Sequence, residues 1–305
     1  MIEKNGFYDL NEAEYHADPA PFPSLSSTFA ADLVEKTEIE ARMGQRRLNP
    51  DYDGEGSDAM DFGTLAHDYI LSGGTTKFEV APFDSWRTNA AKAAKEEIEA
   101  RGLIALNESS SGKIVPKLVA MDAALRDQIA HHRDFRGIMQ KGRAEQSAFC
   151  FDGLIWNRAR FDWIDEAYPH LIVDYKTTAM TFDAWEKSEL WGGKYIQNPH
   201  YRHVYDTITG EKSRFIFLVQ RTVAPHLIKI FHLDENYEPQ IAARYQEARQ
   251  RLAYCLKTGV WRGEPPYAVH ASPPPWVTSK WDIAEMDLAA AKTRSDETPD
   301  VIFAG

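Results

Sequence analysis

One stretch of the sequence interrupts an apolar run with two charges: Leu171-Ile172-Val173-Asp174-Tyr175-Lys176-Thr177-Thr178. Its first three residues are apolar and mostly β-branched, which is typical of a buried strand. Side chains alternate along a strand, so Asp174 and Lys176 project from one face, while Val173 and Tyr175 project from the other. Charges at the end of a buried strand are costly without partners. The stretch alone therefore predicts either a functional site or a structural ion pair.

Two further strands are predicted just before this stretch, at residues 144–151 and 154–164. A turn that contains Pro169 connects the second of them to Leu171. If these strands form an antiparallel hairpin centred near Tyr168, Asp162 lies directly opposite Asp174. Opposed carboxylates destabilise a strand pair unless one is protonated or a cation lies between them. The expected register therefore favours a bound cation.

The rest of the chain alternates between helical and strand patterns, which indicates an α/β protein with a central mixed sheet flanked by helices. Helices are expected at residues 29–43, 59–71, 90–101, 113–140, 181–190, 195–205 and 238–258, and further strands at 77–82, 213–221 and 226–233. Residues 1–23 are expected to be extended, residues 49–58 to form a loop, and residues 109–112 to form a break. We predict one domain over residues 1–262, with a helical N-terminal elaboration. Residues 263–305 are predicted to form a proline-rich arm and a partly disordered tail.

The composition is that of an ordinary soluble protein, with 43% hydrophobic and 27% charged residues. No apolar run approaches the roughly 20 residues of a membrane helix, and no signal pattern opens the chain, so a cytoplasmic location without membrane association is expected. Cys150 and Cys255 are expected to be buried free thiols, and two cysteines cannot form a four-cysteine iron–sulfur site. The net charge of −11 argues against non-specific nucleic-acid binding over the whole surface but leaves room for a local basic groove.

Several polar residues stand out beside the opening stretch. His67 lies four residues after Gly63 on one face of a predicted helix, and Gln197 and Tyr201 share a face in the same way. From its own segment, a structural histidine is the favoured interpretation of His67. Two carboxylates with an imidazole, however, form a mostly oxygen-based site that suits magnesium or manganese. With a lysine nearby, such a site meets the needs of phosphodiester hydrolysis, which are an activated nucleophile and positive charge around phosphorus.

Taken in order, these residues resemble the PD-(D/E)XK nuclease superfamily, in particular its RecB-like branch and the RecE-type phage exonucleases. That branch is marked by a Gly-x-x-x-His helix, a lone acid, a strand aspartate, an Asp-x-Lys strand and a Gln-x-x-x-Tyr helix. The matching segments are Gly63–His67, Glu145, Asp162, Asp174–Lys176 and Gln197–Tyr201. The likeness to the RecE-type group extends over roughly residues 20–280. Two positions depart from the pattern, namely Pro199 inside the last motif and Trp163 after the strand aspartate.

The resemblance implies a restriction-endonuclease-like core that binds magnesium, with manganese as a substitute. The implied metal ligands are His67, Asp162, Asp174 and the backbone carbonyl of Tyr175. Lys176 would position or deprotonate the attacking water. The remaining motif residues would hold ligands or the DNA end; they are Glu145, Gln197 and Tyr201. Glu145 is the one suited to reach a second metal. In this combination a metal ligand becomes the favoured interpretation of His67.

The resemblance also implies an exonuclease that acts on double-stranded DNA ends, degrades one strand 5′ to 3′ and leaves 3′ overhangs for an annealing protein in recombination. RecE-type enzymes form rings around duplex DNA, so a homo-oligomer such as a tetramer, with a basic bore, is expected. Three alternatives stay open: a structure-specific or restriction-like endonuclease, an inactive DNA-end-binding or assembly protein, and an unrelated α/β protein. The candidates for phosphate contacts are Arg87, Arg158, Arg160 and Lys194.

Overall fold

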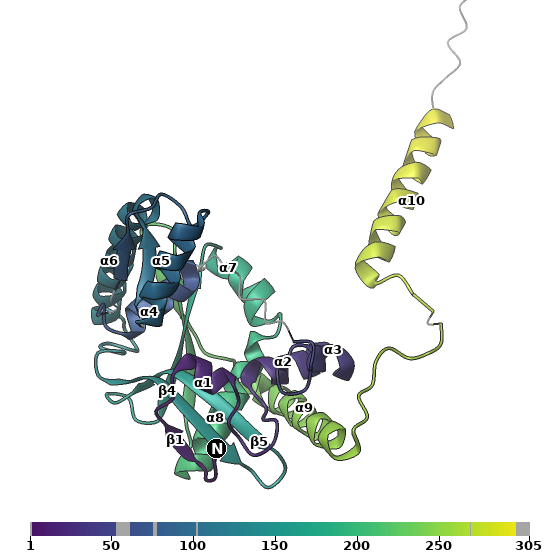
Figure 1. Ribbon diagram of the computed structural model, residues 1–305. Helices are drawn as coiled ribbons and strands as arrows, with labels where there is room; N and C mark the ends of the chain where they lie inside the picture. The colour runs from purple at the N-terminus through teal and green to yellow at the C-terminus, as the bar shows by residue number, and fades with distance from the viewer. Residues whose placement is uncertain (1, 53–61, 76–77, 102, 269, 297–305) are drawn as a thin grey trace, which may run out of the picture. The chain divides into compact units, whose positions relative to one another are not determined.

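The computed structural model describes residues 2–52, 62–75, 78–101, 103–268 and 270–296, and the chain divides into two units, residues 1–263 and 264–305. A mixed sheet of six strands forms the centre of the larger unit (Figure 1). In spatial order the strands are β1 (Gly6–Tyr8), β4 (Gly142–Phe151), β5 (Trp156–Asp165), β6 (Leu171–Thr178), β7 (Arg214–Arg221) and β8 (Ile228–Phe231). The predicted α/β class with a central mixed sheet is confirmed.

Strand β6, which carries the opening stretch, lies in the interior of the sheet. It pairs antiparallel with β5 and parallel with β7, and the other neighbouring strands are antiparallel. The short connection through the Tyr168 turn suits the antiparallel pair, whereas the parallel pair requires a crossover that includes α7 (Phe182–Trp185) and α8 (Gln197–Thr209). The charged end of β6 is therefore enclosed by elements from distant parts of the chain.

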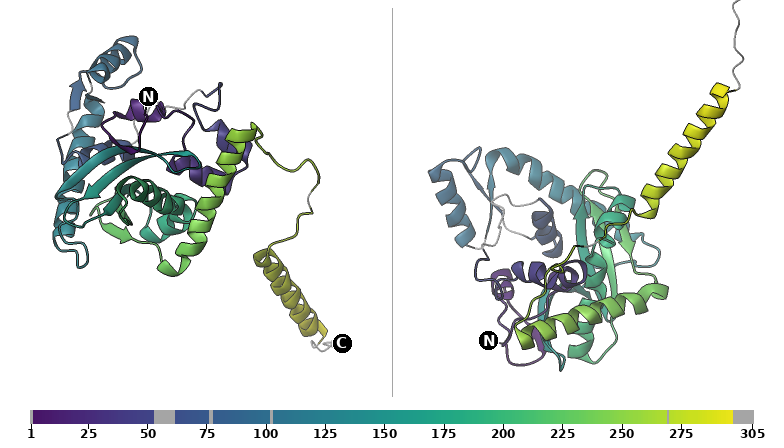
Figure 2. Two further views of the ribbon diagram at one scale, coloured as in Figure 1. Left: turned by 90° about the horizontal axis from the view of Figure 1, so that it is seen from below. Right: turned by 90° about the vertical axis from the view of Figure 1, so that its right-hand side faces the viewer.

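Helices pack on both faces of the sheet. On one face, Ile172 and Phe217 belong to a core cluster with residues of α2 (Ser27–Glu35), α8 and α9 (Glu238–Thr258). On the other face, Val173 and Leu218 pack with residues of α4 (Phe62–Leu71) and α6 (Glu108–Ala130). Figure 2 shows α8 and α9 on one side of the strands. Apolar side chains on both faces of β6 and β7 are thus buried beneath helices.

The ends of α9 follow from local sequence signals. Pro239 lies in its first turn, where the missing N–H group costs nothing. Gly259 closes the helix with φ of 72°, and its N–H group donates to the carbonyl of Cys255. The predicted helix at residues 238–258 is confirmed. Both cysteines are buried free thiols, as expected.

Two helix predictions are wrong in their bounds because local caps were overlooked. The helix expected at residues 29–43 is divided into α2 and α3 (Glu38–Met43), since the Thr37 side chain accepts a hydrogen bond from the Glu40 N–H group and starts a new helix. The expected break at residues 109–112 lies inside α6, because Asn107 caps that helix and the serines fill its first turns. Helix α6 also ends at Ala130, well before residue 140.

The N-terminal segment is also more structured than expected, since it contains β1 and α1 (Glu12–His16). Strand β2 (Phe78–Ala81) was predicted, but its parallel partner β3 (Ile104–Asn107) was not. Helix α5 (Asn89–Ala100) lies between them in the sequence, as expected. Within α4, the expected start at residues 59–61 lies outside the described residues, as does most of the loop expected at 49–58.

The smaller unit contains the helix α10 (Pro275–Asp296), where the sequence was expected to give an arm and a tail. Alanine, the best helix former, occurs four times between Pro275 and Asp296, so the helix agrees with local propensity. Residues 297–305 lie outside the described part. None of the helices in the described residues is both long and apolar enough to cross a membrane.

Candidate metal centre

The centre lies where β5 and β6 separate. The pairs Trp163↔Val173 and Ile164↔Ile172 fix the register, and one further step places Asp162 opposite Asp174, as the sequence predicted. Strand pairing ends before that step. The N–H group of Tyr175 instead donates to Asp162 Oδ2 over 2.9 Å. A carboxylate therefore satisfies a backbone donor that the neighbouring strand no longer reaches.

A third carboxylate faces Asp162 from the other side. The pairs Ala144↔Trp163 and Gln146↔Phe161 flank this position, so Glu145 of β4 lies opposite Asp162 of β5. Glu145 has φ of 51°, in the left-handed region that non-glycine residues seldom adopt. Glu145, Asp162 and Asp174 thus form one row across three strands, which we call the acid row. Neighbouring carboxylates repel one another, so the row requires cations.

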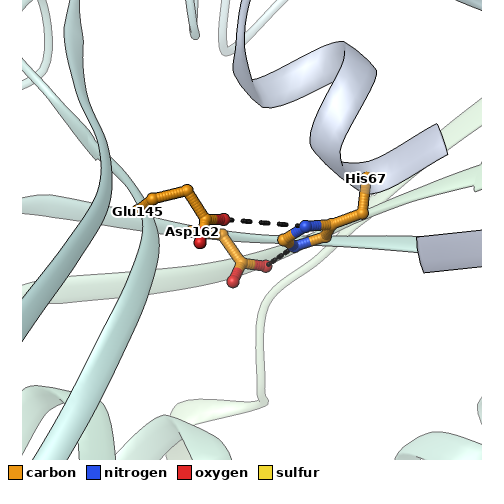
Figure 3. A group of neighbouring side chains, drawn as sticks. All are labelled: His67, Glu145 and Asp162. Atoms are coloured by element: carbon orange, nitrogen blue, oxygen red, sulfur yellow. Dashed lines mark ion pairs between the residues drawn. The ribbon is translucent and has the colours of Figure 1, made fainter. Parts of the chain in front are cut away.

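Two side chains supply positive charge to Asp162, at the centre of the acid row. From α4, His67 Nε2 lies 3.1 Å from Asp162 Oδ2, and its Nδ1 lies 3.6 Å from Glu145 Oε1 (Figure 3). From β6, Lys176 Nζ lies 2.6 Å from Asp174 Oδ2 and 3.7 Å from Asp162 Oδ2. Asp162 is therefore shared between the imidazole and the ammonium group.

These contacts determine the protonation states. Burial alone would lower the pKa of the His67 imidazole, but the Asp162 carboxylate outweighs burial and raises that pKa to about 10. Burial raises the pKa of Asp174 to about 6, although Lys176 opposes the shift. Burial would also raise the pKa of Asp162, but Lys176 and His67 hold it below its usual value. A histidine ligand must be neutral, so metal binding at His67 releases its proton.

The donor set fits a divalent cation. One atom each from His67, Glu145 and Asp162 can be chosen so that all three lie within 4.8 Å of one another. Glu145 Oε1 and Asp174 Oδ1 are buried and have no hydrogen-bond partner among the described residues. Carboxylate oxygens left without donors in this way are suited to bind a hard cation. The structure thus brings Glu145 into the group within ligand reach, whereas Asp174 lies against Lys176.

Helix α8 brings the two residues of the last motif to the same cleft. Gln197 and Tyr201 both line it, and Gln197 Oε1 is buried without a hydrogen-bond partner in the described chain. The Tyr201 ring stacks on Phe215, with centroids 5.7 Å apart and an interplanar angle of 14°. Pro199 is the third residue of α8, where a proline is tolerated, so this departure from the motif leaves the helix intact.

The cleft over the acid row has a volume of about 960 Å³. Ser26, Ser27 and Thr28 at the start of α2 line it, together with Lys117 of α6. Neither these hydroxyl groups nor Lys117 is among the site residues expected from the sequence. The run Ser24–Thr28 was the signal that could have indicated the hydroxyl groups, because one hydroxyl is enough to cap a helix and the others can serve a polar site.

Three of the four candidate phosphate contacts line the cleft: Arg158, Arg160 and Lys194. Each also has an acidic partner, since Arg160 Nε lies 2.6 Å from Glu145 Oε2 and Arg158 Nη1 lies 2.9 Å from Asp18 Oδ2. Arg87 is exposed and is not part of the cleft lining as described.

Trp163 has a structural explanation. Its indole N–H group donates to Asp165 Oδ2 over 3.1 Å, and its ring lies where a Cβ atom at Gly142 would be only 2.6 Å away. The ring therefore needs a glycine on the neighbouring strand. This second departure from the motif leaves the acid row unchanged.

Comparison with known families identifies the fold. Residues 31–266 match the model of a PDDEXK-like domain of unknown function (DUF3799). The chain belongs to this family. The match begins inside α2 and extends beyond the end of α9. It therefore includes the acid row, His67 and Lys176. No curated protein matches the chain.

One solved structure agrees with this fold. The crystal structure of a candidate exonuclease from Eubacterium rectale superimposes with a TM-score of 0.53 and 16% sequence identity, covering 89% of this chain and 98% of that chain. At this identity the likeness establishes the fold alone. Protein VC1899 from Vibrio cholerae gives a TM-score of 0.20 at 11% identity over 75% of this chain and 57% of that chain, which is too low to carry an argument.

Proposed function

We propose that this chain is a magnesium-dependent exodeoxyribonuclease that acts on the ends of double-stranded DNA. The observation that carries the proposal is the acid row beside His67 and Lys176, in which buried carboxylate oxygens have no donor among the described residues. A purely structural ion cluster would satisfy these oxygens. Membership of a PDDEXK-like family adds support for nuclease chemistry.

His67, Glu145 and Asp162 would hold the metal, with Asp174 and the Tyr175 carbonyl as further ligands. Magnesium suits this mostly oxygen-based set, and manganese would substitute. The bound ion would supply Lewis-acid charge to the scissile phosphate and lower the pKa of water. Glu145, whose backbone is in the left-handed region, brings a third acid to within 3.6 Å of His67.

Lys176 has the role of positioning the attacking water and stabilising negative charge on the phosphate. Burial would lower the pKa of its ammonium group, but Asp174 and Asp162 hold that pKa above its usual value. Lys176 is therefore a cation at neutral pH in the structure described. An ammonium group held in place by two carboxylates stabilises developing charge without reorganisation during the reaction.

The finer parts of the proposal rest on the sequence resemblance. They are 5′ to 3′ polarity, 3′ overhangs for recombination, a ring-shaped homo-oligomer such as a tetramer, an annealing protein as partner, and action in the cytoplasm. A cleft of about 960 Å³ holds a few nucleotides of one strand rather than a duplex, which agrees with attack on a single strand at an end.

Duplexes labelled at the 5′ or the 3′ end, incubated with magnesium and then with EDTA, test the proposal. We expect stepwise release of nucleotides from linear duplex with magnesium only, and no cleavage of a covalently closed plasmid. Lys176→Ala should abolish hydrolysis and retain binding to DNA ends. Cleavage of the closed plasmid would identify an endonuclease instead. If wild type and Lys176→Ala are equally inactive with magnesium and with manganese, the chain is a binding protein and the proposal is wrong.

A further inference from the structure

A second cavity, of about 640 Å³, lies outside the cleft and is rich in aromatic side chains. Seven residues line it: Glu35, Trp191, Tyr195, Tyr237, Gln240, Ile241 and Arg244. Two of its rings are open to solvent, since Trp191 is 45% exposed and Tyr237 is 57% exposed. Exposed aromatic rings beside an open cavity are costly to leave in water and are typical of a binding surface. We call this cavity the aromatic pocket.

The floor of the aromatic pocket is fixed. Tyr195 is 7% exposed, and its hydroxyl group donates to Glu35 Oε1 over 3.0 Å. The positive charge of Arg244 also acts on the Tyr195 hydroxyl, where it opposes the rise in pKa that burial and Glu35 cause. The Trp191 and Tyr195 rings lie 5.9 Å apart at 37°. Among the seven lining residues the charge of Glu35 is balanced by Arg244, so the pocket is neutral and presents flat apolar surfaces.

Two elements connect the aromatic pocket to the acid-row cleft. Helix α2 has Ser26–Thr28 in the cleft lining at one end and Glu35 in the pocket lining at the other, about 12 Å further along the helix axis. The segment from Glu189 to Tyr195, which begins in the π-helix η1 (Glu186–Leu190), does the same, because Glu189 and Lys194 line the cleft while Trp191 and Tyr195 line the pocket. A single DNA strand that leaves the cleft along these two elements would reach the aromatic pocket within a few nucleotides.

We propose that the aromatic pocket binds an unpaired nucleobase of the DNA strand that leaves the acid-row cleft. Bases stack on aromatic rings regardless of sequence, and an arginine beside the rings contacts the phosphate or stacks on the base. A neutral aromatic site fits this ligand, because a base carries no charge and an exonuclease must hold strands of any sequence. This inference rests on the proposed function for the identity of the strand.

The test uses the full chain in EDTA, so that binding is separated from hydrolysis. A single-stranded oligothymidylate of 20 nucleotides, with 5-iodouracil in place of some bases, is irradiated with the protein and the attached peptides are identified. We expect attachment at Trp191 or Tyr237. Without irradiation, Trp191→Ala and Tyr237→Ala should each weaken binding of the unmodified oligonucleotide about tenfold. Tyr254→Ala, which removes another exposed ring, is the matched control and should bind as wild type does.

Hydrolysis separates this inference from the proposed function. The small diester bis(4-nitrophenyl) phosphate occupies the cleft alone, so wild type and Trp191→Ala should hydrolyse it equally with magnesium. Attachment at Trp191 or Tyr237 in a protein that hydrolyses no DNA would support the pocket and overturn the nuclease. Hydrolysis of linear duplex by wild type, with both alanine variants folded and binding the oligonucleotide unchanged, would overturn the pocket and leave the nuclease.

Discussion

Two buried charged clusters lie on the same strands of this protein, and they differ in how their oxygens are satisfied. At the end of β4, Asp152 accepts hydrogen bonds from the backbone N–H groups of Leu154 and Ile155 and from the Asn157 side chain, and it forms ion pairs with His203 and Arg249. In the acid row, Glu145 Oε1 and Asp174 Oδ1 are buried and have no hydrogen-bond donor in the described chain, although each carboxylate has a cationic neighbour.

The difference shows that burial and charge alone do not identify a site. Asp152 and Asp174 are both buried carboxylates next to a cation. The carboxylate of Asp152 is fully engaged by its surroundings, as expected of a structural cluster that fixes the β4–β5 turn against α8 and α9. Asp174 retains an oxygen that no described residue satisfies, as expected of an atom that accepts a bound group. The predictions below test whether this contrast separates function from stability.

The largest expected effect is on catalysis. Asp174→Asn should slow hydrolysis of linear duplex at least about 10³-fold, because it removes a carboxylate from the proposed metal centre. In EDTA the free energy of unfolding should change little, because the lost ion pair with Lys176 is offset by the relief of carboxylate burial and of repulsion from Asp162, and Lys176 keeps Asp162 as a partner. Hydrolysis assays and urea unfolding measure the two effects. A large loss of stability would make Asp174 a structural residue and remove the contrast.

The opposite pattern, a loss of stability without a loss of activity, is expected at the Asp152 cluster. Asp152→Asn should lower the free energy of unfolding by about 3 kcal/mol, because it leaves the mostly buried Arg249 side chain without its charge partner. The folded fraction should still hydrolyse DNA, since Asp152 does not line the cleft as described. Urea unfolding gives the stability, and activity is measured below the unfolding transition. Loss of activity without loss of stability would contradict this assignment.

Magnesium should stabilise wild type and Asp152→Asn against unfolding, but not Asp162→Asn. At a concentration a hundredfold above Kd, a single site that binds only the folded state adds about 2.7 kcal/mol to the free energy of unfolding. We expect this gain in wild type and in Asp152→Asn, and not in Asp162→Asn. Thermal unfolding with and without magnesium measures it. An equal gain in Asp162→Asn would place the ion elsewhere.

The smallest effect concerns pH. His200 Nε2 lies 2.9 Å from the Arg158 carbonyl oxygen and Nδ1 lies 3.2 Å from the Tyr245 hydroxyl. Burial lowers the pKa of His200 to about 3, and the positive charges of His203, Arg158 and Arg249 act in the same direction. The folded state keeps His200 neutral while the unfolded chain binds a proton below pH 6.5, so stability falls as pH drops from 6.5 toward 3.

One proton contributes at most about 1.4 kcal/mol per pH unit to this slope. His200→Gln keeps a donor and an acceptor but cannot titrate, so its unfolding free energy should fall less steeply than that of wild type between pH 6.5 and 4.5. The difference between the two slopes isolates His200 from the other titrating groups. Identical slopes would mean that His200 is protonated in the folded state.

Much of the fold was readable in the sequence because its signals are local. The apolar runs of β6 and β7, the proline at the start of α9 and the glycine at its end are each contained in a few residues. The errors arose where one residue changes the outcome, as with the caps at Thr37 and Asn107. Strand β3 could not be recognised because its pairing with β2 is a contact across α5.

The sequence by itself determined the motif residues, and it placed Asp162 opposite Asp174 because hairpin register follows from the turn. Only the tertiary structure decided that Glu145 joins them. Phe161 and Ile164 both belong to the core cluster beside α8 although they are three residues apart, so the alternation of β5 shifts at Asp162. The left-handed Glu145 lies opposite this shift. Strict alternation cannot anticipate a local reversal that requires two strands and the packing of His67 from a distant helix.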